Sequence, residues 1–334
     1  MKTLFSTDEH YNLSPLAYPW AFERYKQARK NFWNPEQVNM SRDIASFKSL
    51  MEHEKEMFLD VFATLTTSDM AIQENLAIRI YELLTPPEIR LWLGHQLADE
   101  SLHSYSYQHI IECLGLDDTS IYRRYQERPY ILSKFTLGNS YADHLKIEHY
   151  DKPETLALGL IFFWLAWEGI WFYHGFSPIL SLGRRGHMSG TCEQLLYIAR
   201  DEVSHFQFGL ELINTLLDEY RLRDNATFTK NVYILFEKLN LAEIVYAKRA
   251  IPEIVSYSAE HHIEQTQYLI NLRLSQTGFK PLYPEAKNAL PWLSEMLELK
   301  KEKNFFESHV SEYQSGAKLD FETTASINEI SNWK

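Results

Sequence analysis

Two copies of one short pattern constrain this chain more than any other feature of its sequence. The pattern is Asp-Glu-x-x-His, and it occurs at residues 99–103 (DESLH) and 201–205 (DEVSH). On an α-helix, residues three positions apart lie on one face, so the Glu and the His of each copy would reach the same point in space. A lone Glu-x-x-His is expected by chance in a chain with 13 His. Two copies, each preceded by Asp and each in an apolar-periodic segment, indicate a cage for metal ions.

Helical bundles that hold two iron or manganese ions take one further carboxylate from each of two other helices. Glu168 is the only charged residue in the apolar segment 156–173, and a buried Glu without a compensating cation would be driven to protonate. Asp69 ends or follows an apolar-periodic segment that begins near residue 57, and taken alone it is more typical of a helix cap. The expected ligands are four carboxylates and two imidazoles: Asp69, Glu100, His103, Glu168, Glu202 and His205.

The charge of this ligand set indicates which ions it would bind. Two divalent cations, about +4, balance four carboxylates, about −4, so the buried cluster would be near neutral. Oxygen-rich ligation with two imidazoles and no thiolate favours iron or manganese and leaves zinc open.

Two neighbours of the expected ligands suggest a redox purpose. Tyr107 follows His103 by four residues on the same helix face, and a phenol beside an oxidisable metal pair can lose an electron and a proton together. Asp201 could accept a hydrogen bond from the distal nitrogen of a ligand His. Taken alone, the two residues are more typical of a core tyrosine and of a solvated or capping acid.

Composition excludes several classes of function. The net charge of −12, from 33 basic and 45 acidic residues, opposes nucleic-acid or anionic-membrane partners. Cys113 and Cys192 are too few for a disulfide scaffold and agree with a reducing cytosol. The N-terminus (MKTLFSTDEHYNL) has no signal-peptide pattern, so we expect a cytoplasmic protein. Because Glu168 would be costly in lipid, the apolar segment 156–173 is interpreted as a buried helix rather than a membrane span.

Helical periodicity dominates the chain, and no strand pattern of comparable length competes with it. Residues 1–43, with Pro15, Pro19 and Pro35, are expected to form an extended N-terminal arm. Thr85-Pro86-Pro87-Glu88 predicts a capping box at the start of a helix that ends near Cys113. Further helices are expected from 153, over 189–220 and 226–251, and over 253–275. Residues 44–290 would form the helical domain, and 291–334 a C-terminal segment with a polar tail.

At this point the chain resembles the radical-generating small (beta) subunit of class I ribonucleotide reductase, a family with a ferritin-like helical bundle. The stretch 31–43 (NFWNPEQVNMSRD) is similar to the family's Phe-Trp-x-Pro-Glu stretch, and residues 100–107 and 198–205 match its two Glu-x-x-His motifs. Asp69 lies 31 residues before Glu100, and Glu168 lies 34 before Glu202, as in the family. Segments 291–292, 304–307 and 310–313 resemble the family's C-terminal region.

The resemblance implies a role for each of these residues. Asp69, Glu100 and His103 would bind one metal, and Glu168, Glu202 and His205 the other, with some carboxylates bridging. Reaction of the reduced metals with oxygen, or with a species derived from it, would oxidise Tyr107 or leave an oxidised metal pair. Trp33, Asp201 and Tyr313 would carry the oxidising equivalent towards the partner. The radical would be protected by an apolar wall formed by Phe172, Phe176 and Ile198.

The resemblance also implies partners. Residues 330–334 would dock on the large catalytic subunit, and the chain would form a homodimer. Because two Cys at unrelated positions are poorly suited to thiyl and dithiol chemistry, the nucleotide site should lie on the other protein. Only some 32 residues precede Trp33, so no regulatory nucleotide-binding domain is expected.

Several alternatives stay open at this stage. All four carboxylates are in place, which disfavours metal-free variants, and Tyr107 disfavours manganese-iron variants in which that tyrosine is replaced. The sequence does not separate a tyrosyl radical on a di-iron or dimanganese site from a dimanganese cluster that itself holds the oxidising equivalent. A ligand-binding oxidase or monooxygenase on the same architecture, and an iron-storage protein, are the competing functions.

Overall fold

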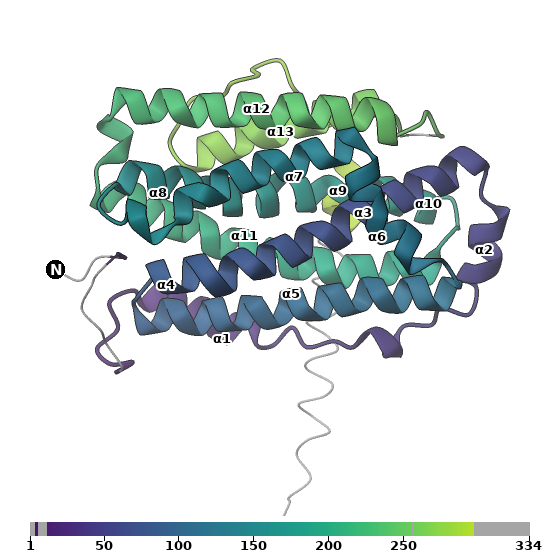
Figure 1. The fold of residues 1–334 in the computed structure, drawn as a ribbon, viewed down its shortest axis with the longest axis horizontal. Coiled ribbons are helices and arrows are strands. Elements are labelled where there is room, and N and C mark those ends of the chain that lie inside the picture. Colours follow the sequence, from purple (N-terminus) through teal and green to yellow (C-terminus); the bar gives the residue numbers. More distant parts are fainter. Residues whose placement is uncertain (1–3, 6–11, 256, 297–334) are drawn as a thin grey trace, which may run out of the picture.

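Four long helices carry the acids and imidazoles singled out above, and they form the centre of the molecule (Figure 1). The structure is a computed structural model that describes residues 4–5, 12–255 and 257–296. The four are α3 (Glu52–Asn75), α5 (Pro87–Leu114), α11 (Ser189–Glu219) and a continuous helix built from α8 (Pro153–Leu160), η5 (Ile161–Phe172) and α9 (Tyr173–Gly175). Helix α11 packs against η5 and α5, and α3 packs against α5.

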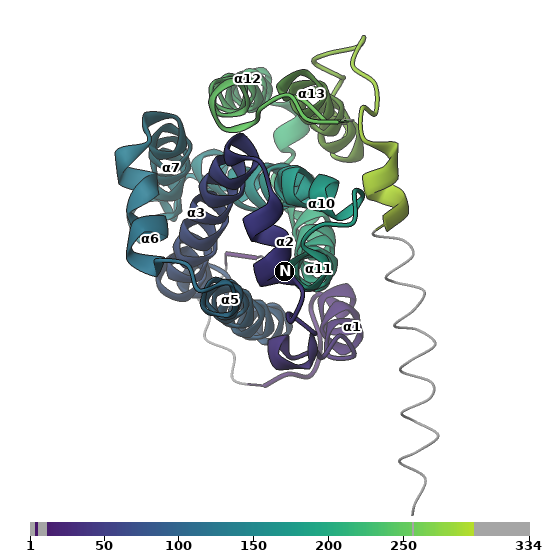
Figure 2. The same cartoon turned by 90° about the vertical axis from the view of Figure 1, so that its right-hand side faces the viewer.

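Further helices cover this centre on several sides (Figure 2). α12 packs against α7 and α13, α13 packs against η5, α6 packs against α3, and α1 lies against α5 and α11. Their bounds are α1 (Pro19–Ala28), α6 (Asp118–Glu127), α7 (Pro129–Ala142), α12 (Ala226–Ala250) and α13 (Ala259–Gln276). The shorter elements are η1 (Pro35–Gln37), α2 (Asp43–Ser49), η2 (Leu76–Ile80), α4 (Tyr81–Leu83), η3 (Asp143–Leu145), η4 (Ile147–His149), α10 (Ser177–Gly183) and η6 (Leu222–Asp224).

The expected all-helical fold is confirmed. Over the described residues the only β-type pairing is one isolated antiparallel bridge between Ile254 and Tyr257. Helix limits follow local signals: Gly115 adopts a φ of +67° at the end of α5, and the Asn225 side chain accepts hydrogen bonds from the first N–H groups of α12. Gly209 lets α11 approach η5 closely, because a Cβ there would stand 2.1 Å from Cγ of Trp164.

The N-terminal region differs from the expected extended arm. It contains α1, with Pro19 at its first position, and η1, with Pro35 at its first position. A proline at N1 favours a helix because the N–H that it lacks would have no intrahelical partner. Asp43 accepts hydrogen bonds from the backbone N–H groups of Gly190 (3.0 Å) and Thr191 (2.7 Å), which ties this region to the start of α11.

The start of α5 differs in its N-cap residue from the prediction made for residues 85–88. The N-cap is Pro86, without a side-chain capping bond. The Glu88 carboxylate instead accepts hydrogen bonds from the backbone N–H groups of Ala17 (2.5 Å) and Tyr18 (2.6 Å). An acid at a helix start is stabilised by the positive end of the helix dipole. Its carboxylate can accept hydrogen bonds from the N–H groups of a neighbouring segment as well as from those of its own first turn.

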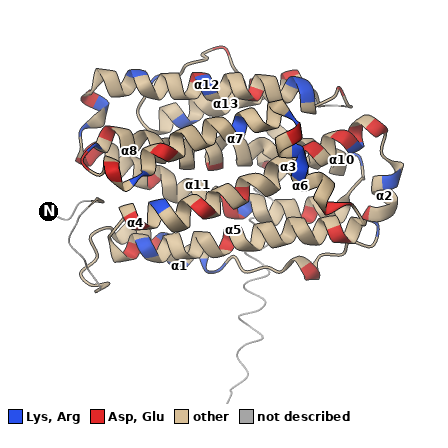
Figure 3. Cartoon of the chain, viewed as in Figure 1, with Lys and Arg blue, Asp and Glu red and all other residues tan. Residues whose placement is uncertain are grey.

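The apolar segment around Glu168 lies inside the fold. Residues Pro153–Gly183 form one helical stretch that is long and apolar enough to cross a membrane, but 94% of its most apolar window is buried by the rest of the protein. A mostly buried helix of this kind agrees with a soluble protein. Figure 3 shows Lys and Arg interspersed with Asp and Glu along the outer helices, so neither sign of charge dominates the face in view.

Candidate metal centre

Each expected ligand lies within a helix and points into the centre of the molecule. Asp69 comes from α3, Glu100 and His103 from α5, Glu168 from η5, and Glu202 and His205 from α11. None of the six side chains exceeds 1% exposure. The helix-cap interpretation of Asp69 is wrong, because α3 continues to Asn75 and places Asp69 well inside the helix.

The six side chains form two overlapping groups of metal-donor atoms. One group is Asp69, Glu100, His103 and Glu202, and the other is Glu100, Glu168, Glu202 and His205; within each, the donor atoms lie within 4.8 Å of one another. Two carboxylates therefore belong to both groups. This arrangement has room for two cations that share a pair of acids.

The shared acids divide their oxygens between the two histidines. Glu100 places Oε2 3.5 Å from Nδ1 of His103 and Oε1 3.2 Å from Nδ1 of His205. Glu202 does the same, with Oε1 3.1 Å from Nδ1 of His103 and Oε2 3.2 Å from Nδ1 of His205. In contrast, Asp69 lies near His103 only (3.8 Å), and Glu168 near His205 only (3.9 Å).

The distal nitrogens of the two histidines face aspartates. Nε2 of His103 lies 3.5 Å from Oδ2 of Asp201, and Nε2 of His205 lies 3.2 Å from Oδ2 of Asp99. Each aspartate comes from the opposite copy of the motif. Such a partner fixes the tautomer and ring orientation of a metal-binding imidazole, leaving Nδ1 free to bind the ion. Sequence reasoning missed the contact of Asp99 with His205, although the Asp that precedes Glu in both copies was a signal for it.

Buried polar atoms without partners show that the site fits cations. Both carboxylate oxygens of Asp69, one oxygen each of Glu100, Glu168 and Glu202, and both ring nitrogens of His103 have no hydrogen-bond partner among the described residues. Such atoms are costly to bury unless something satisfies them. The described contacts also include no Lys or Arg ion pair with any of these four acids, so no such side chain compensates their charge.

Proton affinities in the site are shifted by burial and by the neighbouring charged groups. Burial, reinforced by the neighbouring carboxylates, raises the pKa of Asp69 and of Glu168 well above the ordinary range. Burial alone would lower the pKa of His103 and His205, but the surrounding carboxylates outweigh it and raise both well above the usual value. Without metal, the cluster therefore retains protons, and these would be displaced when cations bind.

Replacing Asp99 by Asn should weaken binding of the ion on the His205 side. The amide keeps the size of the side chain but removes the charge that favours a donated N–H from His205, and loss of such a partner typically costs about 10–100-fold in metal affinity. Calorimetric titration with manganous ion would measure the change. Asp117→Asn, at an exposed position before α6, is the control. Equal affinities in both variants would contradict this role for Asp99.

Tyr107 lies next to this cluster, on the same face of α5 as His103. Its side chain is fully buried, and its hydroxyl has no hydrogen-bond partner among the described residues. Burial, followed by the charges of Asp69 and Glu202, raises the pKa of Tyr107 well above its usual value. The phenol is therefore neutral, and its ring is packed edge-on by Phe62, with ring centres 5.9 Å apart.

The expected apolar wall is buried as well. Phe172 and Phe176 stack on each other with centroids 6.2 Å apart, and both are at most 1% exposed, as is Ile198. Phe62 was not among the wall residues expected from the sequence, since one apolar residue among many in α3 carries no signal of its own.

Asp201 connects the cluster to Trp33 through one hydrogen bond and one close contact. The Trp33 indole N–H donates to Oδ2 of Asp201 at 2.7 Å, the oxygen that faces His103. Arg200 binds the other oxygen of Asp201 at 3.0 and 3.1 Å. The Trp33 ring stacks on Tyr197 with centroids 5.2 Å apart and planes inclined by 12°. No sequence signal pointed to Tyr197, because the two rings are 164 positions apart in the sequence. Tyr313 lies outside the described residues.

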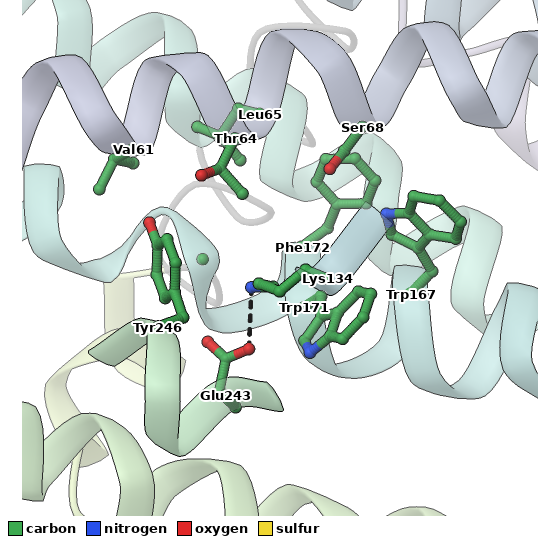
Figure 4. A pocket seen from close by; sticks show the side chains of 11 residues that line it. Val61, Thr64, Leu65, Ser68, Lys134, Trp167, Trp171, Phe172, Glu243 and Tyr246 are labelled. Atoms are coloured by element: carbon green, nitrogen blue, oxygen red, sulfur yellow. Dashed lines mark ion pairs between the residues drawn. The ribbon is translucent and has the colours of Figure 1, made fainter. Parts of the chain in front are cut away.

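A third buried group of His and Glu side chains lies away from this site and has a different character. It consists of His174, Glu243 and His262. The ammonium of Lys134 lies 2.8 Å from Oε2 of Glu243, beside a cavity of about 10 Å³ (Figure 4), and Nε2 of His262 lies 2.6 Å from Oε1. Because Lys134 already compensates the charge of Glu243, this group has no need of a metal ion.

Comparison of the sequence with known proteins identifies a family and several relatives. The family model "Ribonucleotide reductase, small chain" matches residues 10–290. The chain is 34% identical over 317 residues to the ribonucleoside-diphosphate reductase subunit beta of Chlamydia pneumoniae, which covers 92% of this chain and 91% of that protein. It is 29% identical to the corresponding subunit of Treponema pallidum, over 91% of this chain and 88% of the relative.

Solved structures of ribonucleotide reductase subunits are similar to this chain in fold. The ribonucleotide reductase R2 subunit from Clostridium botulinum matches with a TM-score of 0.76 and 25% identity, over 89% of this chain and 98% of that one. The dimanganese(II) form of NrdF from Streptococcus sanguinis matches in fold, with a TM-score of 0.69 and 19% identity over 87% and 99%. These matches favour the reductase subunit over the oxidase and storage alternatives. Because the family model spans most of the chain, the protein belongs to the small-chain family of ribonucleotide reductase.

Proposed function

We propose that the six buried ligands hold two iron or manganese ions and that this site generates the oxidising equivalent of a class I ribonucleotide reductase. The observation that carries the proposal is the pair of overlapping donor groups, which share Glu100 and Glu202. Asp69 and His103 would complete the site of one ion, and Glu168 and His205 that of the other. Four carboxylates match the charge of two divalent cations.

The ions would supply oxidising power once they have reacted with oxygen or a species derived from it. The chain's own residues then determine where the equivalent is kept. Tyr107 is neutral, buried and without a hydrogen-bonded base, so a radical on it would be shielded from solvent. We propose Tyr107 or the oxidised metal pair as the storage site.

Asp201 and Trp33 would pass this equivalent towards the protein surface. Asp201 joins the imidazole of His103 to the indole of Trp33 through one oxygen, so an electron can leave Trp33 while its N–H proton remains in a hydrogen bond to a carboxylate. Tyr313, in the segment outside the described residues, would continue the route to the large catalytic subunit. That subunit would supply the cysteines and the nucleotide site for reducing ribonucleoside diphosphates.

The remaining parts of the proposal concern assembly. We propose a cytoplasmic homodimer in which residues 44–290 form the metal-binding helical domain. Residues 291–334 would form the segment that docks on the large subunit, with its end at 330–334. The N-terminal region 1–43 would serve to position Trp33, since Asp43 and the backbone at Ala17 and Tyr18 are bound to α11 and α5.

Loading the protein separately with ferrous and manganous ions in air, followed by metal analysis and electron paramagnetic resonance, tests this function. We expect two ions per chain and an oxidised product in at least one case.

Tyr107→Phe should remove any sharp tyrosyl resonance without removing the ions. If its activity with the large subunit survives, the metal pair is the oxidant. Tyr141→Phe, a buried tyrosine stacked on Phe162, is the control. Absence of a metal pair in the unaltered protein would contradict the proposal.

A further inference from the structure

One buried amide, that of Gln96, lies against two of the expected metal ligands, and no sequence pattern pointed to it. Gln96 is on α5, one turn before Glu100, and its side chain is fully buried. Its Nε2 donates to Oε1 of Glu168 at 2.8 Å and lies 3.4 Å from Oε1 of Glu100. Its Oε1 accepts from two indole N–H groups, those of Trp164 at 3.2 Å and Trp92 at 3.4 Å.

The two indoles determine which way the amide points. A glutamine side chain can usually turn over, because its oxygen and nitrogen have nearly the same shape. Indole N–H groups can only donate, so the end of Gln96 that faces Trp92 and Trp164 must be its oxygen. The NH₂ end is therefore forced towards the carboxylates. Trp92 and Trp164 come from α5 and η5, so two of the site's helices fix this orientation.

Because of this amide, the two oxygens of Glu168 have different surroundings. Oε1 is engaged by Gln96, whereas Oε2 has no hydrogen-bond partner among the described residues and lies 3.9 Å from Nδ1 of His205. Glu168 thus offers one free oxygen to the donor group that it forms with Glu100, Glu202 and His205. A carboxylate held in this way is restrained from turning both oxygens to one ion.

We propose that Gln96 is a positioning residue that makes Glu168 a one-oxygen ligand, which keeps a coordination position open on the ion bound beside His205. The inference deepens the proposed function and rests on it. A carboxylate that binds through one oxygen takes up one position rather than two, and metal sites that react with an external molecule need such an open position. The hydrogen bond from an uncharged amide achieves this without adding charge to the buried cluster.

Replacement of Gln96 by Met and by Leu tests the inference, because both variants put an apolar side chain of similar size in place of the amide and lack its N–H donor. The measurements are crystal structures of the manganous-loaded proteins, the carboxylate stretching bands in ¹³C-glutamate-labelled samples, and the paramagnetic resonance spectrum of the manganous pair. In the unaltered protein we expect Oε2 of Glu168 at the ion and Oε1 at Gln96. In the variants we expect both oxygens at the ion, with shifted carboxylate bands and an altered spectrum.

Gln194→Met is the matched control. Gln194 is another fully buried glutamine, on α11, which accepts a hydrogen bond from Ser106 at 2.7 Å and belongs to neither donor group. Its replacement should leave the bands and the spectrum unchanged. The inference is overturned if either Gln96 variant keeps the unaltered protein's bands and spectrum, or if Glu168 binds through both oxygens with Gln96 intact. Those results leave the metal pair standing, whereas an unaltered protein that binds no pair would remove the proposed function itself.

Discussion

Trp33→Phe is expected to stop turnover with the large subunit while leaving both ions in place. The variant removes the indole N–H that donates to Asp201 at 2.7 Å but keeps a ring that can stack on Tyr197. If Trp33 only oriented Asp201, and through it His103, its loss would lower activity by about 10–100-fold, as is usual for outer partners of a metal ligand. Loss of a residue on the electron route should lower activity by more than this, with no change in metal content.

Steady-state reduction assays with the large subunit, together with metal analysis of the same samples, distinguish these cases. Trp20→Phe is a matched control, because Trp20 is a partly buried tryptophan that packs against Phe208 and has no described contact with Asp201. We expect the control to keep its activity. Turnover within about tenfold of the unaltered protein in Trp33→Phe would take Trp33 out of the route and leave it a packing residue.

The convergence of most of these six side chains could be predicted because much of the information for it is local. An i, i+3 spacing puts Glu and His on one helix face whatever surrounds the helix, and a lone Glu in an apolar helix indicates a compensating cation wherever it is buried. Asp69 has no such local signal, and taken by itself it pointed to a helix cap. Only its spacing from Glu100, compared with a known family, suggested that it was a ligand.

Contacts that depend on how helices pack could not be predicted in the same way. Asp99 contacts His205, and Asp201 contacts His103. Both contacts require α5 and α11 to pack so that the two motifs lie side by side, and the sequence does not specify this alignment. The π-helical turns of η5 around Glu168 are another example. A π-helical turn contains one residue more per hydrogen-bonded turn than an α-helical turn. This difference leaves no clear pattern in an apolar segment, although such turns are frequent at functional sites.

The N-terminal region shows where local signals mislead. Three prolines suggested an extended arm, but two of them begin helical elements, where the missing N–H costs nothing. The side chain of Glu88 shows a related effect. A carboxylate at a helix start binds whichever N–H groups come within reach, and here the folded arm brings those of Ala17 and Tyr18.

Glu202→Ala is expected to abolish binding of both ions, whereas Glu168→Ala should lose the ion beside His205 first. Glu202 places one oxygen 3.1 Å from His103 and the other 3.2 Å from His205, so its removal takes a donor from both sites at once. Activity with the large subunit should fall to background. Metal analysis after loading with manganous ion gives the stoichiometry directly.

Thermal unfolding with and without manganous ion separates loss of the site from loss of the fold. Cations that bind only the native state stabilise it by about 2.7 kcal/mol at one hundred times their dissociation constant, so the melting temperature of the unaltered protein should rise on loading. Glu202→Ala should unfold cooperatively but show no such rise, and Glu202→Gln should show a reduced one. Glu74→Ala, at an exposed acid of α3, should behave as the unaltered protein does. A full metal-dependent rise in Glu202→Ala would mean that the two donor groups do not depend on the carboxylate they share.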